Sequence, residues 1–181
     1  MAAAANLEAT AAPVSLAELK QFLRIGTSEE DALLAGLVRT ASELCEGFTR
    51  LALIEREVEE RLAATGVWTR LALAPVRAIL GVSMVDDAGA ATPLAAGSYA
   101  VDIDASGEGW VRTARSSAGA RLLVRYRAGQ AAEWNGVPEA LRQGVVRMAA
   151  HLYTHRDSED GRGPPAAATA LWLPYRRLRL R

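Results

Sequence analysis

The stretch VSLAELKQFLRIGTSEEDALLAGLVRTASELCEGFTR, residues 14–50, predicts two helices joined by a short polar turn. Ser15 and Glu18 have the spacing of a capping box, so a helix is expected to begin here. Gly26 is expected to end it, since glycine adopts the left-handed conformation without a steric penalty. Four apolar residues share one side of this first helix: Leu16, Leu19, Phe22 and Leu23.

Thr27 and Glu30 form a second capping box, which predicts the start of a longer helix. Apolar residues then recur at three- and four-residue spacing, in one stripe: Leu34, Leu37, Val38, Ala41, Leu44, Cys45 and Phe48. Burying each large apolar side chain contributes about 1.5–3 kcal/mol. We therefore expect this helix to be a central element of the core.

The composition is that of an ordinary globular protein, with 181 residues, half of them hydrophobic and 23% charged. Its 21 basic and 21 acidic residues cancel, which argues against a whole-protein electrostatic footprint for nucleic acid. The single cysteine excludes a disulfide within the chain. No signal peptide and no apolar run of ~20 residues is present, so we expect synthesis in a cytoplasm and no membrane partner.

After Arg50 the apolar residues alternate with polar ones, which indicates strands. The predicted strands cover residues 54–62, 68–73, 78–85, 99–103, 110–113 and 121–127. Short strands separated by turns imply a small antiparallel sheet, inserted between helices over about residues 53–128. The first strand has a charged face that carries Glu55, Glu57 and Glu59. A solvated surface is the ordinary interpretation, and an acidic wall that repels DNA from a channel lining is the alternative.

Val137 and Pro138 restart a helix, predicted over residues 138–156, because proline is favoured in a first helical turn. Its apolar stripe is expected to pack on the helix of residues 31–48 and consists of Leu141, Val145, Met148, Ala149 and Leu152. The predicted fold class is α+β: a small helical bundle of three main helices plus a short C-terminal helix, with an inserted small antiparallel β-sheet. Residues 1–13 are expected to form a flexible arm, 14–156 a single domain, and 157–181 a linker and tail.

The tail combines an apolar run with arginines and is the first candidate site. One interpretation is a frayed end, or Trp172 folded back onto the core. The other is a docking peptide whose apolar anchors fill a partner's groove while its arginines pair with acidic groups. The candidate docking residues are Leu171, Trp172, Leu173, Pro174, Tyr175, Arg176, Arg177 and Arg179.

Patterns typical of metal or catalytic sites are incomplete in this chain. His151 and His155 lack the glutamate of a metalloprotease helix and a third ligand. The segment from Asp102 to Gly107 resembles the start of a calcium loop, but Thr113 stands where the bidentate glutamate would be. Cys45 has no base in view and is expected to be a buried thiol. We expect no catalytic residues, no metal and no cofactor, and the protein is not predicted to be an enzyme.

Several segments carry a family resemblance: VSLAELKQFLRI at 14–25, EDALL at 30–34, Leu73-x-Pro75-Val76, and Val124-x-Tyr126-x-Ala128-Gly129. In this order they resemble the head–tail connector (adaptor) proteins of tailed bacteriophages and of phage-like gene transfer agents. In one branch of that family a β insertion follows the first helices. The residues fit a phage and a gene transfer agent equally.

The resemblance implies a structural role in the neck of a virion or phage-like particle, for a protein made in the bacterial cytoplasm. It implies a homo-oligomeric ring, a dodecamer, that binds beneath the portal protein after packaging and supports stopper or tail-terminator proteins. DNA would pass through the ring without sequence-specific binding. The C-terminal segment 171–179 would engage the portal, and removal of residues 164–181 is expected to leave a folded protein that no longer binds it.

Three other functions stay open. The principal alternative is a nucleic-acid-binding packaging or regulatory protein that uses the arginine-rich tail, although strong phosphate-driven binding usually needs about 6–10 contacts. An enzyme with an unrecognised site is the second, and a homo-oligomeric non-viral scaffold is the third.

Overall fold

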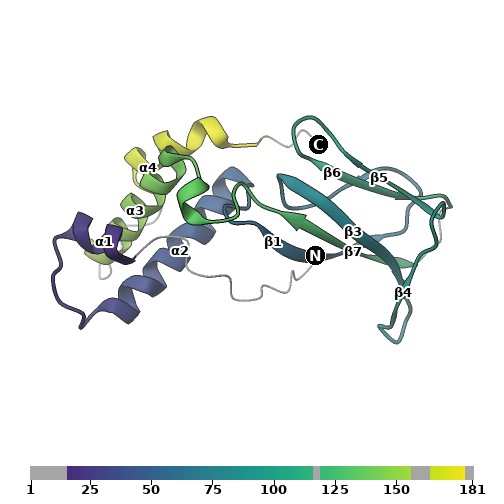
Figure 1. Ribbon diagram of the computed structural model, residues 1–181, viewed down its shortest axis with the longest axis horizontal. Helices are drawn as coiled ribbons and strands as arrows, with labels where there is room; N and C mark the ends of the chain where they lie inside the picture. The colour runs from purple at the N-terminus through teal and green to yellow at the C-terminus, as the bar shows by residue number, and fades with distance from the viewer. Residues whose placement is uncertain (1–15, 116–118, 156–163, 178–181) are drawn as a thin grey trace. The chain divides into compact units, whose positions relative to one another are not determined.

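The computed structural model describes residues 16–115, 119–155 and 164–177, and Figure 1 shows its helices and strands. The predicted α+β class is confirmed, because this part of the chain contains four α-helices and antiparallel strands. The helices are α1 (Leu16–Leu23), α2 (Asp31–Thr49), α3 (Glu139–Thr154) and α4 (Ala166–Trp172), with short 3-10 turns η1 (Trp134–Gly136) and η2 (Leu173–Tyr175). None of the described helices is long and apolar enough to span a membrane. Ser15 and the predicted arm lie outside the described residues.

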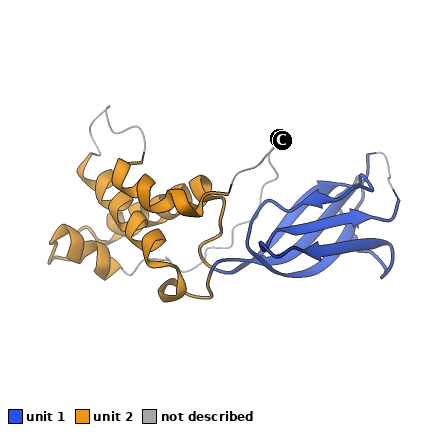
Figure 2. Ribbon diagram, turned by 90° about the horizontal axis from the view of Figure 1, so that it is seen from above, with its two compact units in different colours: residues 1–9, 55–130 blue, residues 10–54, 131–181 orange. Residues whose placement is uncertain are grey.

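The chain divides into two compact units (Figure 2). The described residues before Glu55 and after Gln130 form a helical unit, and residues 55–130 form a sheet unit. Each unit has a hydrophobic core of its own. The strands bury their apolar residues among themselves, while the predicted core between α2 and α3 forms across the insertion.

Helix α3 packs on α2, as its apolar stripe predicts. Leu141, Val145, Met148 and Ala149 are all buried in the core of the helical unit, together with Leu34 and Val38 of α2. Leu53 and Ala131 join the core where the chain leaves the helical unit and returns to it. Their backbones are linked by a hydrogen bond that the Ala131 N–H donates to the Leu53 carbonyl at 3.3 Å.

The apolar stripes of α1 and α2 are buried less completely than predicted. Leu19, Leu34 and Cys45 are fully buried. In contrast, Phe22 on α1 is 46% exposed and Leu44 on α2 is 39% exposed. The predicted stripes are thus wider than the faces that the helical unit covers.

The start of α2 differs from the capping box predicted at Thr27. Glu30 is the N-cap residue, and no side chain caps the helix. At the start of the helix the Asp31 N–H donates a hydrogen bond to the Ser28 carbonyl. The carboxylate of Glu30 instead accepts a hydrogen bond from the Tyr153 hydroxyl on α3. The glutamate of the predicted cap joins α2 to α3 instead.

The end of α1 also differs from the prediction that Gly26 takes the left-handed conformation. Arg24 does so, with φ 59°. The Ile25 N–H donates to the Lys20 carbonyl at 2.9 Å. The Arg24 N–H donates to the Gln21 carbonyl at 3.3 Å. These are the two hydrogen bonds of a Schellman motif, so the left-handed residue that ends the helix lies two residues before the expected glycine.

The sheet unit contains two sheets instead of the single small sheet predicted. The strands are β1 (Arg56–Ala63), β2 (Thr69–Arg70), β3 (Val76–Val85), β4 (Ala91–Pro93), β5 (Tyr99–Ile103), β6 (Gly109–Thr113) and β7 (Arg121–Ala128). One sheet has the order β1-β7-β3-β4 and the other β2-β6-β5, and every pair is antiparallel. The strand β4 was not predicted, because its three residues, Ala91-Thr92-Pro93, are too few to show an alternating pattern.

The two sheets share one core, to which Val124 of β7 and Val111 of β6 both belong. A buried carboxylate, that of Glu60, lies within this core. Its Oε2 accepts hydrogen bonds from the Tyr126 hydroxyl at 2.9 Å and from the Ala72 N–H at 2.8 Å. A buried polar group needs such partners. Glu60 therefore holds the segment after β2 against the first sheet.

Candidate functional site

The C-terminal candidate site consists of α4 and η2, which belong to the helical unit. Pro165 precedes α4 in an extended conformation, and a run of alanines forms its first turn. Ala168 and Trp172, four residues apart, share one face of the helix and are both fully buried. The sequence therefore builds a short helix that adds one large aromatic side chain to the core.

Trp172 lies in a space that Gly144 on α3 leaves open. A Cβ atom at position 144 would lie 2.0 Å from the indole Nε1 of Trp172. The indole N–H points to the Leu141 carbonyl oxygen, with a distance of 3.4 Å. Its ring also contacts Phe48 of α2, with 5.9 Å between centroids. Trp172 thus joins α4 to both main helices of its own chain.

This position corrects the role expected of Trp172 as an anchor for a partner. Its side chain fills the core of its own helical unit, which is the alternative that the sequence left open. The exposed residues of the segment are Leu173 (57% exposed), Pro174 and Arg176. Removing residues 164–181 would therefore take away part of the core. Portal binding by the remaining exposed residues stays a prediction.

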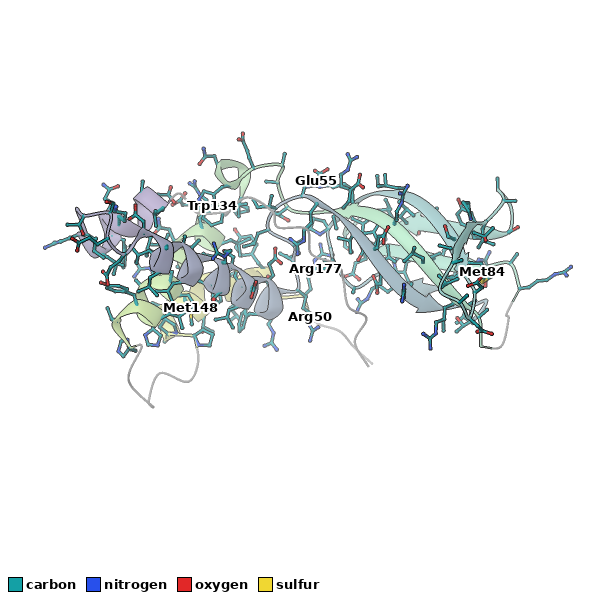
Figure 3. All side chains as sticks on the ribbon, turned by 90° about the horizontal axis from the view of Figure 1, so that it is seen from below. Arg50, Glu55, Met84, Trp134, Met148 and Arg177 are labelled. Carbon is teal, nitrogen blue, oxygen red and sulfur yellow. The ribbon has the colours of Figure 1, made fainter. Side chains whose placement is uncertain are left out.

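The residues after η2 are held against the end of α2. The Arg176 guanidinium lies over the Phe48 ring, 5.3 Å from its centroid. The Arg177 N–H donates to the Thr49 carbonyl at 3.0 Å, and Figure 3 labels Arg177 beside Arg50 at that end of α2. Leu171 and Tyr175 are half-buried. Arg179 lies outside the described residues.

The acidic strand is β1, and its glutamates face the basic strand β7. Glu57 pairs in register with Arg127, and Glu59 with Arg125. The Arg127 guanidinium also lies 3.5 Å from the Glu55 carboxylate. Opposite charges directly across an antiparallel pair stabilise each other. This face is therefore mixed in charge and is not a uniformly acidic wall. Its position on a channel stays a prediction.

His151 lies in the last turn of α3, and His155 is the residue that follows the helix. The rings of His151 and His155 stack with 4.2 Å between centroids at the end of the helix. Among the described residues, no group of three His, Cys, Asp or Glu side chains could hold a metal ion.

The calcium-like segment is a tight hairpin between β5 and β6. Asp104 Oδ1 accepts hydrogen bonds from the Ser106 side chain at 2.6 Å and from the Glu108 N–H at 2.9 Å. Its Oδ2 accepts one from the Trp110 indole at 3.1 Å. These donors lower the pKa of Asp104 to about 2, and the Ser106 side chain has the largest effect. The carboxylate is used within the hairpin, as the interpretation of a strand end and turn predicts.

Cys45 is fully buried on α2. Burial raises the pKa of its thiol, so the thiolate that reacts with electrophiles or metals is disfavoured. The expectation of a buried thiol is confirmed.

The comparisons with known proteins agree with the resemblance seen in the sequence. A sequence profile described as phage gp6-like head-tail connector protein matches residues 13–68. No curated protein matches the chain.

Solved structures match it over almost its whole length. A chain in the neck of an empty GTA particle, computed with C6 symmetry, is 30% identical with a TM-score of 0.81, and the match covers 98% of this chain and 97% of that chain. A chain in the neck of a native GTA particle, computed with C12 symmetry, is 30% identical with a TM-score of 0.77. This match covers 100% of this chain and 98% of that chain.

A chain in the virion of a native gene transfer agent particle is also 30% identical, with a TM-score of 0.75 over 98% and 97%. Both compact units therefore have counterparts in a single chain of a phage-like particle. With these matches and its connector profile, the chain belongs to the family of structural head–tail connector proteins of phages and phage-like gene transfer agents.

Proposed function

We propose that this protein forms a dodecameric ring in the neck of a phage-like particle. The ring binds beneath the portal of the DNA-filled capsid and provides the next surface for stopper or tail-terminator proteins. DNA passes through its centre without sequence-specific contacts. In this role the protein holds other proteins in place and catalyses no reaction.

One observation carries the proposal: the full-length match to neck chains of particles computed with C12 and C6 symmetry. A ring of identical subunits needs two different faces on each subunit, whose contact closes after a fixed rotation. The zero net charge is compatible with a protein that surrounds DNA without gripping it.

The test is to mix the purified full-length protein with the portal of the same particle and to image the product by electron microscopy. A second ring stacked on the portal, with 12 copies at the symmetry proposed here, is the expected result. Portal rings that stay bare at all protein concentrations would contradict the proposal. A salt-sensitive mobility shift of duplex DNA, without portal binding, would favour the nucleic-acid-binding alternative.

The portal-docking part of the proposal rests on the exposed residues after Trp172. Leu173→Asp combined with Arg176→Glu changes two exposed side chains and leaves the buried indole in place. The double variant is expected to fold and to lose portal binding, because it puts a charge in place of an exposed apolar side chain and reverses the charge of an arginine, a residue type enriched among hot spots. Val67→Asp is the matched control, because Val67 is an apolar residue of similar exposure (65%) on the sheet unit. Normal portal binding by the double variant would refute docking through this segment.

A further inference from the structure

We propose that two apolar surfaces on the helical unit are the two halves of the contact between neighbouring copies in the ring. The first, here called the outer stripe, consists of Leu33, Leu37 and Leu44 on α2. The second, the α1–α3 groove, is lined by Phe22 and Val146. In this proposal the outer stripe of one copy packs into the α1–α3 groove of the next. The inference rests on the proposed ring and names the surfaces that close it.

The outer stripe is a face of α2 that its own chain leaves partly uncovered. Leu33 is 44% exposed and Leu44 39% exposed, and Leu37 between them is half-buried. The spacings of four and seven residues place all three on one side of the helix. Gly47 lies beside them, and a Cβ there would meet no atom within 4 Å, whereas the Arg39 guanidinium would lie 3.8 Å from a Cβ at Gly36. A neighbouring chain could therefore approach this face closely.

The α1–α3 groove has a volume of about 340 Å³, and Gln21 and Gln143 form its sides. Phe22 projects into it with 46% of its surface exposed, and Val146 is buried at its floor. Glu18 also lines the groove, but its carboxylate already accepts a hydrogen bond from the Trp134 indole at 3.2 Å. The free part of the groove is therefore mainly apolar and amide in character.

The two surfaces face away from each other. Lys20 of α1 forms an ion pair of 2.7 Å with Asp31 of α2, which fixes the side of α2 that α1 occupies. At 3.6 residues per turn, Asp31 lies about 140° around the helix from the centre of the outer stripe. The stripe is thus turned away from α1 and its groove. Two unlike surfaces on opposite sides are what a head-to-tail ring contact requires, whereas a two-fold dimer would pair one surface with itself.

The charges at the two rims are complementary. Exposed Glu43 lies about 100° around α2 from the centre of the outer stripe, on the side of Gly36 and Gly47. Exposed Arg147 lies at the groove, with its guanidinium 5.9 Å from the centroid of the Phe22 ring. Ion pairs at a rim add little affinity but fix register and exclude wrong partners. The pairing of Glu43 with Arg147 would set which copy follows which around the ring.

Cross-linking tests the contact directly. Thr40→Cys places a thiol beside the outer stripe, and Gln21→Cys places one at the groove. Native Cys45 is fully buried and stays silent. In portal-bound rings treated with a flexible bismaleimide, the double variant is expected to give a ladder of multimers, and each single variant only monomers. Dimers from a single variant, or no ladder from the double variant in intact rings, would overturn the inference.

Charge exchange gives an independent readout. Glu43→Arg and Arg147→Glu are each expected to reduce ring yield, and the combination should restore it. Arg61→Glu, at an exposed position on β1 of the sheet unit, is the control and should leave ring yield unchanged. Equal yields for all four variants would also overturn the inference. If the wild-type protein forms no ring on the portal, the proposed function fails first; rings that form without these contacts refute only the inference.

Discussion

The indole of Trp172 occupies the space in which a side chain at Gly144 would begin, with only 2.0 Å between Nε1 and an added Cβ atom. This contact explains why the C-terminal segment belongs to the fold. It also makes Gly144 a requirement for packing, in spite of the lower helix propensity of glycine.

We therefore expect Gly144→Ala to lower the free energy of unfolding by about 1–3 kcal/mol, because the added methyl group must displace the indole. Gly47→Ala is the matched control. Gly47 also lies within a helix, but its added Cβ meets nothing, so the free energy of unfolding should rise by about 0.5–1 kcal/mol. Urea titrations followed by circular dichroism measure both. A Gly144→Ala protein as stable as wild type would show that Trp172 is not held as described.

Arg50 ends α2 in the left-handed conformation, with φ 60°. That conformation costs about 1–2 kcal/mol for a residue with a Cβ, and glycine adopts it freely. Arg50→Gly should therefore raise the free energy of unfolding by about 0.5–1 kcal/mol and raise Tm. Arg39→Gly, in the exposed interior of the same helix, should lower it by about 1 kcal/mol. Thermal unfolding of the two variants checks the contrast in sign.

The buried bond between Glu60 and Tyr126 is expected to stabilise the sheet unit. Tyr126→Phe removes the hydroxyl that donates to the carboxylate, and it also removes the acceptor of the Leu73 N–H at 3.3 Å. We expect a loss of about 1.5–3 kcal/mol, as for hydrogen bonds to charged groups. Tyr99→Phe, on a half-exposed residue of β5, should change stability by less than about 0.5 kcal/mol. Similar effects of the two substitutions in denaturant titrations would contradict this role.

The hairpin held by Asp104 should weaken in acid. Its hydrogen bonds lower the pKa of Asp104 to about 2, below the value of about 3.9 in an unfolded chain. The stabilisation is therefore present above about pH 4 and is lost as the pH falls through about 2. Asp104→Asn removes this titration, so the stability difference between wild type and variant should shrink between those values. Asp102→Asn, at an exposed position on β5, is the control, and a constant difference for Asp104→Asn down to pH 2 would count against the assignment.

Regular periodicity allowed much of the fold to be predicted. The strand ranges and the α2–α3 pairing follow from apolar residues at spacings of two and of three to four. The helix ends were harder to predict. Glu30 bonds to Tyr153 of α3, and Arg24 takes the left-handed backbone conformation, and neither is visible in the local sequence. Short β4 carries no pattern of its own.

The candidate site was predicted only in part. An apolar run beside arginines has the same composition whether it binds a partner or fills its own core. Gly144 decides between them for Trp172, and its relation to a residue 28 positions away is invisible to local patterns. Likewise, the glutamates of β1 could not be interpreted alone, because their arginine neighbours lie on a strand that is distant in sequence.

The chain leaves the helical unit for the sheet unit and returns to it at one point, where Ile54 and Ala131 form a parallel bridge. The two ends of this insertion lie next to each other, so the helical unit does not depend on the sheet unit to bring its two parts of the chain together. A version of this chain that joined residue 54 directly to residue 131 would therefore keep the helical bundle continuous.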